Sequence, residues 1–184
     1  MFHQHGTTLP ELLASLAVIT IVAGAALPSV TRIVQRSEST ASINWIVAAV
    51  NYTRNSAISH GQMVTLCPAD GDHCGGKWHN GMLIFADEDH DGKFGSRDRI
   101  IGRVGPLPGG GTITFRAFRR RQYLQITPMG HTNYQNGDFV YCSADQDPLY
   151  ARQLVVNVQG RARVVRTRDE DGNVVDRRGR RLRC

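Results

Sequence analysis

An unbroken apolar run close to the N-terminus limits the folds open to this chain. No charged side chain occurs from Leu12 to Thr31, a stretch of 20 residues. A helix of about 20 mostly apolar residues spans the hydrocarbon core of a bilayer. Glu11 stands at the N-terminal edge of the run, and a carboxylate in lipid is costly unless it is paired. The sequence therefore predicts one membrane-spanning helix that begins beside a functional carboxylate.

The residues from Gly6 to Glu11 resemble the leader of the type IV prepilins. In that family a very short leader ends in Gly, a peptidase cuts after the Gly, and a Glu is the fifth residue of the mature chain. The resemblance implies a leader over residues 1–6, processing between Gly6 and Thr7 by a prepilin peptidase, and a role in assembly for Glu11. Pro28 fits the proline that bends the helix late in the apolar run of that family.

Two other interpretations of the N-terminus remain open, a secretory signal peptide and a plain membrane anchor. Residues 23–26 are small enough to form a signal-peptidase site after the apolar run. A signal peptide also carries a basic segment before its apolar run, and residues 1–11 contain no Lys or Arg. The positions of Gly6 and Glu11 therefore favour the prepilin interpretation.

The helical pattern continues beyond the membrane segment. Ile43, Ile46, Val50 and Ala57 recur at helical spacing with polar residues between them. We expect one helix from about residue 8 to residue 60, with a transmembrane and assembly half over residues 7–31 and an amphipathic half over residues 32–60. Gly61 is expected to end it.

Short strands separated by turn residues follow the helix. Eight are expected, over residues 63–67, 81–86, 99–104, 112–115, 122–127, 138–142, 153–158 and 161–166. This pattern predicts an α+β fold, in which the C-terminal half of the long helix packs on an antiparallel β-domain over residues 61–166. Residues 167–184 are polar and rich in Arg, and are expected to form a flexible basic tail.

The whole layout resembles the minor pilins and pseudopilins of the FimT and GspH type. The resemblance is visible at the leader, in the segment from Trp78 to Asp87, and at Gly160-Arg161-Ala162-Arg163. FimT-type proteins of naturally competent bacteria carry a Gly-Arg-x-Arg motif that is linked to DNA binding during uptake. The resemblance implies an inner-membrane protein with a periplasmic domain that later enters a filament, with other pilins and DNA as partners.

The charge of the chain is unevenly distributed. The net charge is +6, and nine Arg but only four acidic residues follow Gly160. If Arg161 and Arg163 lie on a strand they point to the same face, where two guanidinium groups suit neighbouring phosphates. Gly160 is expected to permit a positive φ or a close approach to the ligand. The candidate DNA-binding residues are Gly160, Arg161, Arg163, Arg166, Arg168, Arg180, Arg181 and Arg183. An exposed basic strand without a ligand is the alternative.

A second basic cluster lies in a predicted hairpin, at Arg116, Arg119, Arg120 and Arg121. The flanking aromatic residues Phe115, Phe118 and Tyr123 have two interpretations. They could stack on bases, but the pattern favours side chains of the core.

The four cysteines all follow the apolar run, and the prepilin interpretation implies that they face the periplasm, where disulfides persist. Three pairings are possible. We favour Cys67–Cys74, which closes a tight loop, and Cys142–Cys184, which ties the C-terminus to the domain. Their spacings match no zinc motif.

An acidic segment between two expected strands matches part of a calcium-loop pattern. Asp87, Asp89 and Asp91 occupy positions one, three and five, a Gly follows at position six, and Asp98 takes the twelfth position. An acidic turn without metal is the favoured interpretation.

No motif predicts catalysis, and no cofactor is expected. Two classes of function remain. One is a minor pilin that binds DNA and contributes to natural transformation. The other is a structural minor pilin or type II secretion pseudopilin that acts in assembly without binding DNA.

Overall fold

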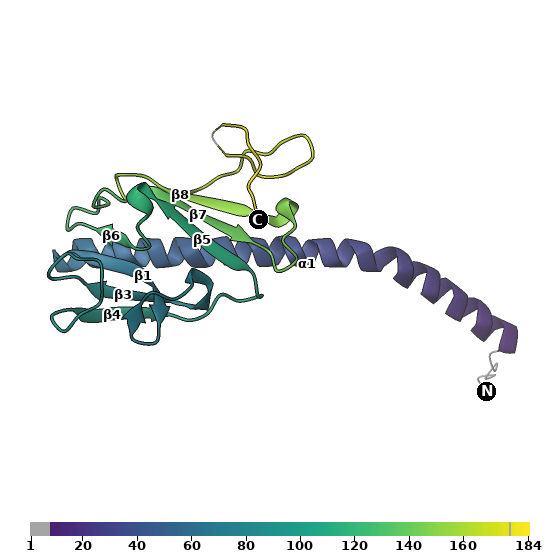
Figure 1. Ribbon diagram of the computed structural model, residues 1–184. Coiled ribbons are helices and arrows are strands. Elements are labelled where there is room, and N and C mark those ends of the chain that lie inside the picture. The colour runs from purple at the N-terminus through teal and green to yellow at the C-terminus, as the bar shows by residue number, and fades with distance from the viewer. Residues whose placement is uncertain (1–7, 177) are drawn as a thin grey trace. The chain divides into compact units, whose positions relative to one another are not determined.

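The computed structural model describes residues 8–176 and 178–184 (Figure 1). The proposed processing residues Gly6 and Thr7 therefore lie outside the described residues, as does Arg177. The chain divides into two compact units, residues 1–37 and residues 38–184.

One helix, α1 (Leu9–His60), runs through the N-terminal part of the chain and confirms the prediction of a single long helix. It can accommodate Pro10 because the first turn of a helix has no partner for the missing N–H. Its C-terminus is set by Gly61, whose φ of 61° is readily adopted only by glycine. The amide of Gln62 then donates to the carbonyl oxygen of Ala57 at 3.3 Å and closes the last turn.

The first unit holds the apolar part of α1. Its large apolar side chains are exposed, as Leu12 and Ile21 illustrate with exposed fractions of 51% and 72%. By length and composition this helix can cross a membrane. Glu11 lies in its first turn, and the carbonyl oxygen of Glu11 accepts a hydrogen bond from Ser15 Oγ at 2.8 Å.

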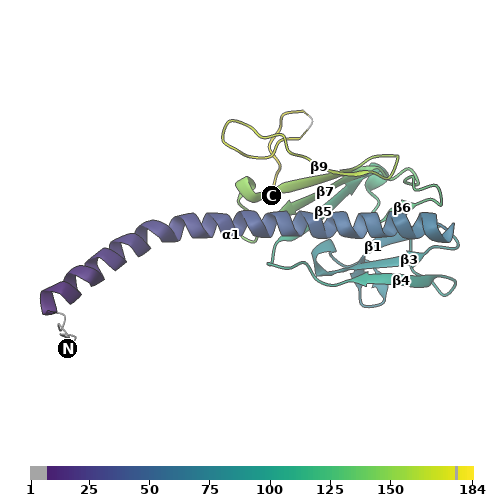
Figure 2. The same cartoon turned by 180° about the vertical axis from the view of Figure 1, so that it is seen from behind.

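The second unit combines the rest of α1 with two antiparallel sheets (Figure 2). The first sheet has the order β2-β1-β3-β4, with β6 paired to β1, and the second has the order β5-β7-β8-β9. The strands are β1 (Val64–Asp70), β2 (His73–Cys74), β3 (Met82–Ala86), β4 (Arg99–Val104), β5 (Thr112–Ala117), β6 (Leu124–Ile126), β7 (Gly137–Cys142), β8 (Arg152–Val156) and β9 (Ala162–Val164). Three short 3-10 helices join them: η1 (Trp78–Asn80), η2 (Phe118–Arg120) and η3 (Pro148–Tyr150).

The core lies where α1 meets both sheets. Ile46 and Val50 of the helix are fully buried in one cluster with side chains of both sheets. Trp78 fills the junction and contacts Phe115 and Phe139 edge-on, with ring centroids 5.3 Å and 5.0 Å away. Aromatic edge contacts of this kind add to the stabilisation that burial already supplies. The predicted packing of the C-terminal half of α1 on an antiparallel domain is confirmed.

Strands form in all eight predicted regions, with ends that differ by a few residues. The prediction missed β2, which is only two residues long and pairs with the end of β1. The Cys67–Cys74 disulfide closes this short hairpin, and the Cys142–Cys184 disulfide joins the C-terminus to β7. Both favoured disulfides are therefore present.

The expectation of a flexible tail after residue 166 is wrong. Val174 and Leu182 are buried against Val140 and Val165 on the outer face of the second sheet. Two isolated bridges, Arg168 with Val174 and Val175 with Arg181, fold the segment into successive turns. Apolar burial and the Cys142–Cys184 disulfide thus fix a stretch whose polar composition suggested disorder.

Candidate nucleic-acid interface

The Gly-Arg-x-Arg motif forms the turn of the β8–β9 hairpin. The amide of Gly160 donates to the carbonyl oxygen of Asn157 at 2.9 Å, and the amide of Arg161 donates to Asn157 Oδ1 at 2.9 Å. Gly160 has a φ of 70°, which confirms the expected need for positive φ. Gly160 also packs closely against another part of the protein. A Cβ at Gly160 would lie 2.2 Å from the carbonyl oxygen of Gly130.

Arg54 of α1 also lies beside this turn, although no sequence motif indicated it. Its Nε donates to the carbonyl oxygen of Gly130 at 3.1 Å, and its Cδ would lie 3.3 Å from a Cβ at Gly160. Such a contact joins residues that are distant in sequence, so no local pattern could have revealed it. Gly160 therefore has a structural role, because it lets the hairpin pack against α1 and the loop around Gly130.

Arg161 and Arg163 share the outer face of the second sheet. Ala162 and Val164 pack against the main core, whereas the two arginines that alternate with them are exposed. No described residue forms an ion pair with either guanidinium group. Arg166 follows on the same stretch, is exposed, and also has no ion pair with a described residue. The structure thus places Arg161 and Arg163 on one face with their charges uncompensated, and Arg166 two residues beyond the end of β9 with its charge likewise uncompensated.

The second basic cluster lies at the same end of the same sheet. Antiparallel pairing places the end of β5, the start of β7, the end of β8 and the start of β9 in one row: Ala117, Gly137, Val156 and Ala162. The η2 turn continues from Ala117, and the Gly160 turn continues from Val156. Arg119 and Arg120 are both exposed in left-handed backbone conformations, with φ of 60° and 54°.

The interpretation of all three flanking aromatic residues as core is wrong for Phe118. Phe115 is buried and Tyr123 is partly buried, but Phe118 is 59% exposed. The cause is the η2 turn, which ends the alternation of the strand. The guanidinium carbon of Arg119 lies 5.6 Å from the centroid of the Phe118 ring. An aromatic face is therefore available beside the arginines, and bases stack on such faces.

Two arginines of the C-terminal segment, unlike those of β9, form ion pairs with aspartates. Arg180 pairs with Asp176 at 2.8 Å, and Arg181 pairs with Asp169 at 2.5 Å and with Asp171. Hydrogen bonds from the backbone and side chain of Arg180 help to lower the pKa of Asp176 below its ordinary value. Partial burial raises the pKa of Asp169, but hydrogen bonds from Asn173 and Arg181 outweigh it, so that this pKa is also lowered. These contacts neutralise much of the basic segment.

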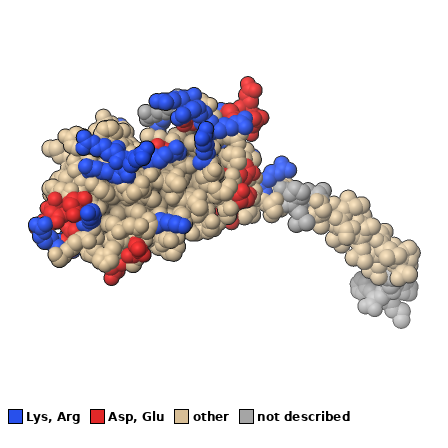
Figure 3. All heavy atoms as spheres, viewed as in Figure 1, with Lys and Arg blue, Asp and Glu red and all other residues tan. Residues whose placement is uncertain are grey.

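The remaining candidates of that segment are less constrained. Arg168 donates through Nη1 to the carbonyl oxygen of Gly172, and Arg183 is exposed. Figure 3 shows basic side chains over the end of the second sheet, and a separate group near the C-terminal segment where acidic side chains lie among the basic ones. The least compensated positive charge therefore lies on β9 and η2.

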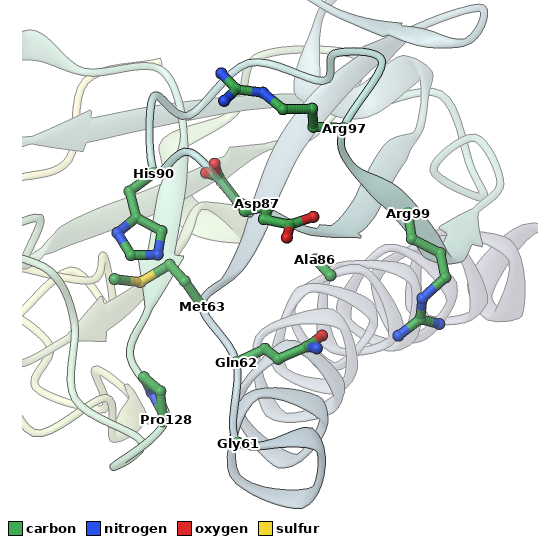
Figure 4. Close-up of a pocket in the computed structure, with 10 residues that line it drawn as sticks. Gly61, Gln62, Met63, Ala86, Asp87, His90, Arg97, Arg99 and Pro128 are labelled. Carbon is green, nitrogen blue, oxygen red and sulfur yellow. The ribbon is translucent and has the colours of Figure 1, made fainter.

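The acidic segment lies in the loop that joins β3 to β4 of the first sheet. Asp87 is buried and Asp89 and Asp91 are exposed, with one carboxylate oxygen of each within 4.8 Å of the others. Asp98 does not join them, because its two oxygens accept the amides of Glu88 and Gly95 at 2.9 Å and 2.7 Å. A pocket of about 430 Å³ opens beside the loop (Figure 4).

The structure can be compared with those of known proteins. It superposes on two crystal forms of the type IV minor pilin FimU of Pseudomonas aeruginosa, with TM-scores of 0.57 and 0.51 and 16% identity in each case. These matches cover 72% and 68% of this chain and 91% and 90% of the FimU chains. The minor pseudopilin EpsH of the Vibrio cholerae type 2 secretion system matches with a TM-score of 0.47 and 13% identity. This match covers 67% of this chain and 94% of the EpsH chain.

Sequence comparison gives the family. Among curated protein sequences, none matches the chain significantly. The model of the type II transport protein GspH matches residues 42–160, which is more than half of the chain. This span begins in α1 and ends at the Gly160 turn, so it contains both sheets except β9. The chain therefore belongs to the family of the type II transport protein GspH, whose members are structural pilin-like proteins and not enzymes.

Proposed function

We propose that this protein is a minor pilin that binds DNA through the arginines at one end of its second sheet and contributes to DNA uptake in natural transformation. The observation that carries the proposal is the convergence of two arginine groups, Arg161 with Arg163 and Arg119 with Arg120, at that end. Neither group forms an ion pair with a described carboxylate, so both are available to phosphates. Arg binds phosphate with two parallel hydrogen bonds, which suits a row of phosphates along a strand.

The arrangement supports contacts to the backbone of DNA and gives no support for reading of bases. The arginines lie on the face and at the end of a sheet, and none of them belongs to α1, the one α-helix of the described residues, so none is carried into a major groove by such a helix. Binding through phosphates is largely independent of sequence and falls steeply with salt concentration. Phe118 adds an exposed ring that can stack on an unpaired base, and this favours single-stranded segments at the η2 turn.

A salt series tests the proposal. Full-length protein in dodecyl maltoside micelles is titrated with labelled duplex DNA at several salt concentrations, and the slope of log K against log salt is measured. The double variant Arg161→Gln/Arg163→Gln should weaken binding to all sequences alike and flatten the slope by up to about 2, since each lost phosphate contact removes about 0.9.

A matched control removes the same charge from the other sheet. Arg99 and Arg103 are exposed on β4 and are likewise near one another in sequence. The variant Arg99→Gln/Arg103→Gln should keep the slope of the wild type. Equal slopes for the wild type and the Arg161/Arg163 variant would contradict the proposal, as would a loss of binding confined to one DNA sequence.

The family match supports a second candidate, a pseudopilin of type II secretion that does not bind DNA. The two candidate functions predict different phenotypes when the gene is disrupted. Disruption of a DNA-binding minor pilin lowers transformation frequency and leaves protein secretion intact, whereas loss of a secretion pseudopilin has the reverse effect. The Arg161→Gln/Arg163→Gln variant is the sharper probe, because exposed substitutions leave the stability of the fold largely unchanged.

A further inference from the structure

The loop between β3 and β4 brings three carboxylates close together. One oxygen from each of Asp87, Asp89 and Asp91 lies within 4.8 Å of the other two. No other group of three His, Cys, Asp or Glu side chains among the described residues meets this condition. Like charges at this separation repel one another unless a cation or a proton lies between them.

Asp87 has one carboxylate oxygen saturated and the other without a partner. Oδ2 accepts hydrogen bonds from Thr65 Oγ1 at 2.5 Å, Gln125 Nε2 at 2.6 Å and the amide of Gly92 at 3.1 Å. Oδ1 is buried and has no hydrogen-bond partner among the described residues. The residue as a whole is only 1% exposed. A buried oxygen of a carboxylate that lacks any donor is costly, and such a group marks a position where a ligand is expected.

The saturated oxygen fixes the position of the unpaired one. Thr65 on β1 and Gln125 on β6 are cross-strand neighbours and are both fully buried. Gln125 is itself held through Oε1, which accepts from Asn133 Nδ2 at 2.6 Å. Side chains that orient a ligand residue in this way raise the affinity of a metal site. The first carboxylate of the loop is therefore held rigidly by the sheet.

We infer that this loop binds a calcium ion through Oδ1 of Asp87 and the carboxylates of Asp89 and Asp91. The donor set consists only of oxygen, which suits a hard cation and does not suit zinc. Calcium accepts irregular sets of oxygen ligands, whereas magnesium demands a near-ideal octahedron. Gly92 follows the three aspartates with a φ of 78° and makes the sharp turn that returns the chain toward Asp87.

Two charged neighbours have defined roles in the inferred site. Arg97 pairs with Asp89 at 2.7 Å and is 71% exposed, so it competes with the ion for that carboxylate. Asp98 holds the loop through the amides of Glu88 and Gly95 and is a positioning residue. The site belongs to the first sheet and does not depend on the proposed binding of DNA, which involves the second sheet.

Terbium luminescence and calorimetry test this inference on the full-length chain in dodecyl maltoside micelles after treatment with a chelator. Tyr123 lies against Gly92, since a Cβ at Gly92 would lie 2.3 Å from its ring. Excitation of tyrosine should therefore produce emission from one bound terbium ion per chain. Calcium should displace this ion and abolish the emission. Calcium should also raise the Tm, and above Kd the stabilisation should grow with the logarithm of the calcium concentration.

Variants at the exposed ligands give the decisive comparison. Asp91→Asn should weaken calcium binding about tenfold or more, because affinity follows the number of charged ligands. Arg97→Gln should tighten binding by up to about fivefold, the size of an exposed ion pair. The control Asp72→Asn removes an exposed aspartate that pairs with Arg103 on another loop, and should bind calcium as the wild type does.

Three results would overturn the inference. The first is the absence of saturable calcium binding at millimolar concentrations by the wild-type chain. The second is equal affinity for Asp91→Asn and Asp72→Asn. The third is competition by magnesium as strong as that by calcium, which would assign the loop to a non-selective acidic surface. Asp87→Asn is not used as the primary variant, because its carboxylate also holds Thr65 and Gln125 in the core.

Discussion

Replacement of Gly160 by Ala separates the structural role of the Gly-Arg-x-Arg turn from the role of its arginines. The alanine must adopt a φ of 70°, which costs an L-residue about 1–2 kcal/mol. Its Cβ would also lie 2.2 Å from the carbonyl oxygen of Gly130, a backbone atom that cannot rotate away. Overpacking of this kind costs about 1–3 kcal/mol. We therefore expect Gly160→Ala to lower the free energy of unfolding by about 2–5 kcal/mol.

Gly61→Ala is the matched control. Gly61 has a φ of 61°, but a Cβ there meets nothing within 4 Å. This variant should lose only the backbone contribution of about 1–2 kcal/mol, so the difference between the two variants isolates the contact with Gly130.

Urea unfolding in dodecyl maltoside micelles, followed by tryptophan fluorescence, measures both variants. Trp45 and Trp78 both pack in the main core, so the signal reports on residues 38–184. Equal losses of stability for Gly160→Ala and Gly61→Ala would refute the argument that the hairpin is locked against the Gly130 loop. Retention of wild-type stability by Gly160→Ala would refute it as well.

Two further outcomes are expected. Glu11→Ala should leave membrane insertion intact but reduce incorporation into filaments, because the carboxylate then no longer pairs with a cationic group of a neighbouring subunit; quantification of the variant in sheared filaments measures this, and unchanged incorporation would contradict the pairing. The C-terminal segment should loosen in acid: the pKa values of Asp169 and Asp176 lie below the ordinary 3.8, so their contribution is complete above about pH 3.8 and is lost as the pH falls through the lowered values. The methyl NMR signals of Val174 and Leu182 should shift in that range while those of Ile46 stay constant, and simultaneous shifts of all three would indicate global unfolding instead.

The sequence was sufficient for the elements whose patterns are long and regular. The apolar run and the spacing of Ile43, Ile46 and Val50 predicted a helix that ends at Gly61, because helical periodicity and a left-handed glycine are local properties. Alternation of apolar and polar residues likewise located eight strands. The β2 strand was missed because two residues provide no alternation to detect.

The C-terminal segment was misjudged for a different reason. Its composition is that of a disordered tail, yet Val174 and Leu182 pack against an apolar surface on the outer face of the second sheet. Only the folded sheet creates that surface, and the Cys142–Cys184 disulfide joins the end of the segment to the sheet. A few apolar residues among many charged ones were the available sign, and their partners lie in distant parts of the chain.

The pairing of charges changes what the net charge of +6 implies. Nine arginines follow Gly160, which suggests a basic tail that adds diffuse attraction for DNA. In the folded chain Arg180 and Arg181 are held by three aspartates of the same segment, so phosphate would have to compete with carboxylates already in place. Arg161 and Arg163 have no such competitor among the described residues. The salt slope of DNA binding should therefore depend on the β9 arginines far more than on those near the C-terminus, although the latter are more numerous.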